Sequence, residues 1–336
     1  MFPSTTLLST REEWRACAEY LGDLGYRSLL VDWPGWHQRN VPLNWAIEDD
    51  IREQTLISTF AKYAYSVLDH SRLEYPNSPI NIAVSGANAA LHVIRAINEL
   101  DDGRNSFGSL TCFCPSWRFY LTRWVPEGYP RRLERRRATA AWMLTNCFAR
   151  SKVAFRMYRS KVGISKLSKR LYEEKIQNNQ DLLDSKREVI MRDRPLSLDV
   201  AMILGQFNSV SSTPDLLKEL LSIDTNDSDG NNNHEDSDDD DGLLNIRVPN
   251  SNVLESNPET AVSKRKLFLV FPQDVVPKDK EELSVIREWA EHHGYGTVDI
   301  PGRIFCHEES PALSATIINN FISEKSATET VASHVS

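Results

Sequence analysis

Short apolar runs alternate with amphipathic stretches along most of the chain. The runs at residues 80–84, 109–114, 267–271 and 297–300 are four to six residues long and lack a regular polar alternation. They predict strands buried on both faces, because apolar side chains then point to both sides of the sheet. A further run at 27–32 predicts another strand, followed by a turn at Trp33, Pro34 and Gly35.

The stretches between these runs have helical periodicity. Trp14, Cys17 and Leu21 recur at helical spacing and predict a helix over 11–24 that ends at Gly25. Thr10 with Glu13 predicts a capping box at its start, in which each side chain bonds the other residue's backbone. Further helices are predicted at 51–68, 89–100, 280–293 and 311–322.

Strands that alternate with helices predict an α/β fold, a mostly parallel sheet with helices on both faces. The predicted core is divided into residues 1–115 and 264–323. Between its halves lie a basic helical insertion at 116–223 and an acidic stretch at 224–263, and residues 324–336 form a polar tail that we expect to be disordered.

Composition narrows the class of protein without giving a function. With 336 residues and 40% hydrophobic positions, the chain is neither collagen-like nor wholly disordered. No apolar run approaches the roughly 20 residues of a membrane-spanning helix, and the amino terminus lacks the features of a secretory signal. Five cysteines, an odd number, favour a reducing compartment, so we expect a soluble cytoplasmic protein.

Charge is strongly segregated. Residues 116–194 carry 20 Lys and Arg against 8 Asp and Glu, whereas the rest of the chain carries 19 basic and 39 acidic residues. The overall charge of −8 therefore combines a local +12 with −20 elsewhere. Nine of the acids fall between 224 and 242 with no basic residue among them, which predicts a disordered loop. A calcium loop is the alternative, because Asp227, Asp229 and Gly230 have suitable spacing.

The basic segment contains five arginines between 131 and 137, followed by an apolar stretch with Trp142, Met143 and Phe148. This pattern is open to three interpretations: a solvated helix, a helix on an anionic lipid surface, or a nucleic-acid contact. We expect no nucleic-acid partner, because no recognition motif accompanies the arginines. Histidines and cysteines lack metal-ligand spacing, and no glycine-rich loop follows the first predicted strand, so neither a metal nor another cofactor is expected.

The order of these motifs resembles the α/β-hydrolase superfamily. The resemblance rests on Asp32 in Val-Asp-Trp-Pro-Gly after an early strand, the strand, turn and helix over 80–100, a strand ending at Pro115, and the insertion that follows it. Asp274 after a later strand and His307 before the last helix complete the set. The opening residues and the Asp32 turn look closest to an uncharacterised plant and cyanobacterial branch.

The resemblance implies acyl transfer on an ester or thioester. Ser85, in Ala-Val-Ser-Gly-Ala, would be the nucleophile, His307 the base, and Asp274 the acid that orients the imidazole. Backbone N–H groups of Gly86 and of the loop containing Thr5 would stabilise the oxyanion. The substrate would be a small or lipid-like ester, and the oligomeric state is left open.

Another alignment gives a different function. If the helix predicted over 89–100 is aligned with the superfamily at Arg95, Ala89 takes the nucleophile's place. If the last loop is aligned at Glu309 and Pro311, Ile304 takes the place of His307. The protein would then be a non-catalytic relative that binds a small ligand, a lipid surface or a protein partner.

Members of that superfamily have two or three strands before the position of Pro3, one of them central in the sheet. We therefore expect this sequence to be an incomplete or divergent version of a longer protein. An added amino-terminal segment would also make a plastid a second expected location.

Overall fold

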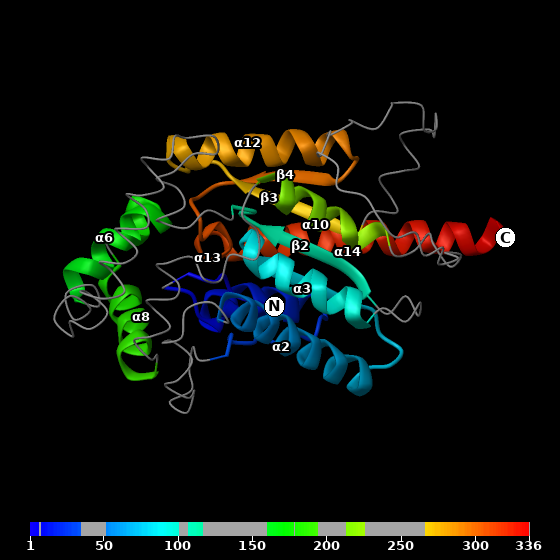
Figure 1. Cartoon of the computed structure of the whole chain (residues 1–336), viewed down its shortest axis with the longest axis horizontal. Helices are drawn as coiled ribbons and strands as arrows, with labels where there is room; N and C mark the ends of the chain where they lie inside the picture. Colours follow the sequence, from blue (N-terminus) through cyan, green and yellow to red (C-terminus); the bar gives the residue numbers. More distant parts are fainter. Residues whose placement is uncertain are drawn as a thin grey trace, which may run out of the picture.

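The computed structural model describes residues 1–6, 8–34, 52–100, 107–116, 160–177, 179–193, 213–225 and 266–335. Figure 1 shows a sheet covered by helices, with a group of short helices at one end. The arginine cluster at 131–137 and the acidic run between 226 and 242 lie outside the described residues, and so do Asp227, Asp229 and Gly230 of the alternative calcium loop. Our interpretations of those segments stay predictions.

The sheet of the described residues has four strands in the order β1 (Ile80–Ser85), β2 (Phe107–Phe113), β3 (Leu267–Pro272) and β4 (Gly296–Ile300). All three neighbouring pairs are parallel. In the register, Ser85 lies opposite Phe113, and Phe113 lies opposite Val270. The prediction of an α/β protein with a parallel sheet is confirmed at this level, and the four strands coincide with the four apolar runs.

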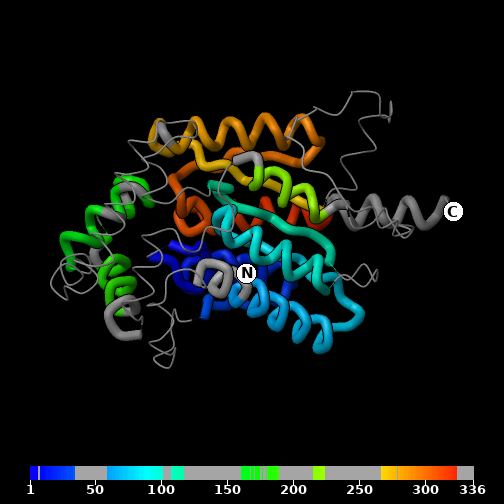
Figure 2. The backbone as a smooth tube through the Cα atoms, viewed as in Figure 1, coloured from blue at the N-terminus to red at the C-terminus, as the bar shows by residue number. Residues whose placement is uncertain are grey.

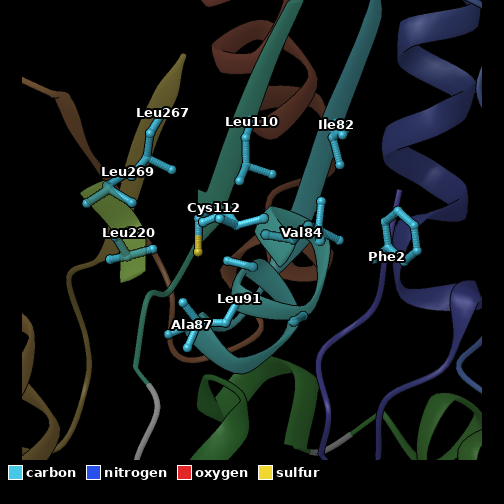
Figure 3. Packing of buried hydrophobic residues seen from close by; sticks show 14 of the residues in the cluster. Phe2, Ile82, Val84, Ala87, Leu91, Leu110, Cys112, Leu220, Leu267 and Leu269 are labelled. Carbon is cyan, nitrogen blue, oxygen red and sulfur yellow. The ribbon is translucent and has the colours of Figure 1, made fainter. Parts of the chain in front are cut away.

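Helices pack on both faces of the sheet. One face carries α2 (Arg52–Glu74), α3 (Ala87–Leu100), α10 (Thr213–Thr225) and α12 (Pro277–His292); the other carries α1 (Arg15–Asp23) and α14 (Pro311–Val335). Strand residues alternate between these faces, as β-strand geometry requires. Ile82 and Val84 belong to the first core cluster, whereas Ala83 belongs to the second. Figure 3 shows the first cluster, in which Phe2 lies beside Ile82 and Val84.

The amino-terminal helix begins as predicted but is not capped as predicted. A short 3₁₀ turn, η1 (Arg11–Trp14), leads into α1, and Gly25, with φ of +90°, ends the helix. Thr10 stands at the N-cap without a side-chain hydrogen bond, so the predicted capping box is wrong. The carboxylate of Glu13 instead turns into the protein and accepts the Ser4 backbone N–H at 3.0 Å.

The predicted strand at 27–32 is also wrong, because the structure has no strand there. Its backbone is bonded to Met1: the Met1 amine donates to the Leu29 carbonyl at 2.7 Å, and the Val31 N–H donates to the Met1 carbonyl at 3.3 Å. A strand needs a neighbour along its length, and here the neighbour is one residue long.

The described part of the insertion is helical, as predicted. It contains α6 (Lys161–Leu171), α7 (Glu174–Gln177) and α8 (Gln180–Asp193), which lie together at one end of the molecule (Figure 2). The polar tail is a correction: α14 continues through it to Val335, in a stretch without glycine or proline. No helix of the described residues is long and apolar enough to cross a membrane.

Candidate functional site

The predicted site lies at the carboxyl end of the parallel sheet, where β1 turns into α3. β1 ends at Ser85, and α3 begins at Ala87, so a single residue makes the turn. That residue is Gly86, whose φ of +85° is in the left-handed region. Its N–H donates to the Phe113 carbonyl at 2.8 Å, which ties the turn to the end of β2. Gly86 therefore occupies the left-handed position of this turn.

Alanine at Gly86 is expected to destabilise the protein although there is room for it. An added Cβ would meet only Ser4 Cβ at 3.7 Å and the Ser116 carbonyl at 3.9 Å, so the cost comes from the backbone. We expect Gly86→Ala to lower the free energy of unfolding in urea by about 1–2 kcal/mol. Gly22→Ala, in α1 with nothing near its added Cβ, should raise it by up to about 1 kcal/mol. A Gly86→Ala protein as stable as the wild type would contradict the geometry of this turn.

Ser85 is the last residue of β1 and is 1% exposed. It shares a sheet face with Ala83, so its side chain points towards α1 and α14. Among the described residues, its hydroxyl has no hydrogen-bond partner. Ala89, the other candidate for the nucleophile's position, is buried within α3.

His307 lies on the short helix α13 (Cys306–Glu309) and is completely buried. Its ring lies 4.2 Å from that of Trp14 and 5.9 Å from that of Phe113, between centroids. Nε2 is 3.2 Å from Oε1 of Glu13, close enough for an ion pair when the ring is protonated, although the two atoms are not aligned as a hydrogen bond. Nδ1 has no hydrogen-bond partner within the described ranges. Ile304, the alternative to His307, is partly buried against the first core cluster.

Glu13 is the site residue that the sequence analysis missed. It is 1% exposed and joins the loop after Phe2 to α13, through the Ser4 N–H and His307. The sequence does carry a signal for its inward position. Glu13 precedes Cys17 by four residues, which puts both on the buried stripe of this helical segment.

Asp274 occupies an exposed turn after β3. Its carboxylate accepts the Gly302 N–H at 3.2 Å, and its own N–H donates to the Gly302 carbonyl at 3.0 Å. These bonds connect the turns after β3 and β4. Among the described residues, no hydrogen bond or ion pair joins Ser85, Asp274 and His307 to one another.

Gly86 and Thr5, the predicted sources of the oxyanion donors, lie among contacts that the sequence could not reveal. The Gly86 N–H is bonded to Phe113, as described above. Thr5 is 3% exposed, in a loop where the Ser9 hydroxyl pairs with those of Ser4 and Thr6 at 2.7 Å each. The loop is thus a closed network of small polar side chains.

The insertion helices cover α13 through a buried ion pair. Nζ of Lys186, on α8, lies 2.8 Å from the Glu308 carboxylate and 3.3 Å from the Leu8 carbonyl. The Tyr172 hydroxyl donates to the same carboxylate at 2.6 Å, and burial together with Glu308 raises the pKa of Tyr172 well above its usual value. Lys186 also faces the rings of Tyr172 and Phe305. These contacts fix the insertion over His307.

The described cysteines are free and buried. Burial raises the pKa of Cys17 to about 12 and raises the pKa values of Cys112, Cys114 and Cys306 as well. Thiols in this state are poor nucleophiles, because the thiolate is the reactive form. Within the described ranges, no group of three His, Cys, Asp or Glu side chains could hold a metal ion.

Comparison with models of known protein families finds no match, and no curated protein matches the sequence.

Proposed function

We propose that this chain is a hydrolase-like α/β protein that binds a partner and does not carry out acyl transfer through Ser85. The observation that carries the proposal is Gly86 at the left-handed position of the turn between β1 and α3. In serine hydrolases of this fold, the nucleophile itself occupies the strained turn, which lifts its hydroxyl to the top of the sheet. Glycine has no side chain to present there.

The surroundings of the other candidate residues support the same proposal. The carboxylate beside His307 is that of Glu13, whereas Asp274 is bonded to Gly302 at the surface. The N–H of Gly86 is already bonded to Phe113. A nucleophile needs a base within hydrogen-bond reach and free donors for the oxyanion. Two of the groups that the hydrolase mechanism would use, the Asp274 carboxylate and the Gly86 N–H, therefore have other structural roles here.

One observation favours the enzyme as a second candidate. Buried polar groups in proteins are nearly always hydrogen-bonded, yet the Ser85 hydroxyl and the His307 Nδ1 have no such partner among the described residues. Both lie towards the same end of the sheet, since His307 contacts Phe113 and Phe113 pairs with Ser85. A movement that brought these two side chains within hydrogen-bond distance would give a serine with a base beside it.

Ester hydrolysis distinguishes the two functions. We expect the wild-type protein and Ser85→Ala to release p-nitrophenol from p-nitrophenyl butyrate at rates within about twofold of each other. Ser66→Ala, at an exposed serine of α2, is the matched control. A loss of about tenfold or more in Ser85→Ala alone, with all three proteins folded by circular dichroism, would overturn the proposal.

A further inference from the structure

The turn between α2 and β1 carries a sequence motif that neither the sheet nor the candidate site uses. Its residues 76–79 are Pro-Asn-Ser-Pro. Of the 16 prolines in the chain, three directly follow a serine or threonine, and these three follow Ser78, Thr213 and Ser310. Ser78 alone among them has a second proline two residues before it.

Prolines at these two positions suit one class of protein kinase. Proline has no backbone N–H, and its ring fixes φ near the extended region. Proline-directed kinases hold the residue after the acceptor in an apolar pocket that offers no partner for a backbone N–H, so they select proline there. Mitogen-activated protein kinases also favour a proline two residues before the acceptor. Ser78 meets both requirements.

The fold presents this segment to solvent. α2 ends at Glu74 and β1 begins at Ile80, so the motif lies wholly between the two elements. Six of the seven residues 73–79 are exposed, Ser78 among them, and Tyr75 is half-buried. The Ser78 N–H closes the turn by donating to the Tyr75 carbonyl at 3.2 Å. Because this bond lies outside α2 and β1, a kinase can extend the turn in its substrate groove while both elements stay folded.

Ser310 provides a comparison within the same chain. It also precedes a proline, but it is half-buried and stands directly before α14. Its N–H donates to the Cys306 carbonyl at 2.9 Å, and its carbonyl accepts the Ser314 N–H at 2.9 Å. A kinase would have to open the start of α14 to reach Ser310, whereas the turn at Ser78 is already accessible.

The turn also has a cation beside it. The guanidinium of Arg27 lies 4.7 Å from the centroid of the Tyr75 ring and pairs with the Glu74 carboxylate at 3.8 Å. The Arg27 side chain is 78% exposed, so it can reorient. Arginine pairs strongly with phosphate, because its planar fork of N–H groups matches the phosphate oxygens. A phosphate on this turn would therefore find a counter-charge.

We propose that Ser78 is a phosphorylation site for a mitogen-activated protein kinase, with ATP as the phosphate donor. The Ser78 Oγ forms a bond to the γ-phosphorus of ATP, the bond from that phosphorus to the bridging β–γ oxygen breaks, and ADP leaves. The hydroxyl proton passes to the catalytic aspartate of the kinase. The product adds a charge of about −1.5 to −2 to the turn. The inference does not depend on whether Ser85 has acyl-transfer activity.

Phosphorylation of the folded full chain tests the proposal. The protein is incubated with an active mitogen-activated protein kinase, Mg²⁺ and ATP, and mass spectrometry of its peptides measures the initial rate at each serine. We expect phosphate on Ser78, at a rate about tenfold or more above that on Ser310. No phosphate on Ser78 of the folded chain, or equal rates at Ser78 and Ser310, would overturn the proposal.

Two protein variants test whether the motif directs the kinase. Pro79→Ala restores a backbone N–H directly after the acceptor and should lower the rate at Ser78 about tenfold or more. Pro301→Ala, at an exposed proline that follows Ile300, is the matched control and should stay within about twofold of the wild type. Both prolines are exposed, and thermal unfolding verifies that both variants fold. A rate at Ser78 that is the same in Pro79→Ala as in the wild type would overturn the proposal.

Discussion

Replacing Trp14 with alanine is expected to lower the free energy of unfolding by about 4 kcal/mol. The indole is completely buried where α1, α14 and α13 meet the sheet. Its ring lies against His307 and Phe113, and its N–H donates to the Phe2 carbonyl at 3.0 Å. The substitution therefore removes a large apolar volume, and the lost volume is the main cost because the Phe2 carbonyl still accepts the Ser85 N–H at 3.2 Å.

Tyr20→Ala is the matched control, since Tyr20 lies on the neighbouring helix α1 and is 46% exposed. Surface changes of this kind usually cost less than about 1 kcal/mol. Urea unfolding followed by circular dichroism measures both variants. Equal losses for Trp14→Ala and Tyr20→Ala would show that Trp14 is not the buried centre of this face.

Replacing Lys186 with methionine is expected to destabilise the protein by about 3 kcal/mol. The side chain of Lys186 is 4% exposed and that of Glu308 is 12% exposed, so the substitution leaves a largely buried carboxylate without its counter-charge. The Tyr172 hydroxyl would still donate to Glu308, and methionine would keep the contacts with the Tyr172 and Phe305 rings. The expected loss is therefore mainly electrostatic.

The insertion supplies its own control in Lys161. This lysine pairs with Asp184 at 3.0 Å, but the two side chains are 65% and 44% exposed. Because solvent screens such pairs, Lys161→Met should cost less than about 1 kcal/mol. Hydrogen exchange measures the effect locally. The amides of α8 should exchange faster in Lys186→Met than in the wild type, and at the wild-type rate in Lys161→Met. If α8 exchanges equally in both variants, the insertion is not held by Lys186.

The sequence predicted the parts of the fold that depend on local pattern. Four apolar runs became the four parallel strands. β1, β2 and β3 are mostly buried, as expected for strands covered on both faces, whereas β4 ends the strand order and only its last residue, Ile300, is buried. The helix after Thr10 and its end at Gly25 also followed from spacing and from glycine's conformational freedom. The single-residue turn at Gly86 lies within the strand-to-helix junction that the pattern indicated.

What the pattern missed depends on partners that are distant in the chain. The run at 27–32 has strand composition, but its backbone pairs with a single residue, Met1, in the part of the chain that the structure describes. Glu13 fits a capping box by spacing, yet the Ser4 N–H and His307 draw its carboxylate inward. Asp274 does stand directly after a strand, and its bonding partner Gly302 could not be read from spacing. The catalytic roles of Ser85, Asp274 and His307 stay predictions.

Labelling with a fluorophosphonate probe tests the proposed lack of acyl-transfer chemistry most directly, because the probe forms a covalent adduct only with an activated serine. Peptide mapping of the labelled full chain should find no adduct on Ser85, and wild type, Ser85→Ala and Ser66→Ala should incorporate equal, background amounts. An adduct on Ser85 that disappears in Ser85→Ala and persists in Ser66→Ala would contradict the account and establish a serine hydrolase.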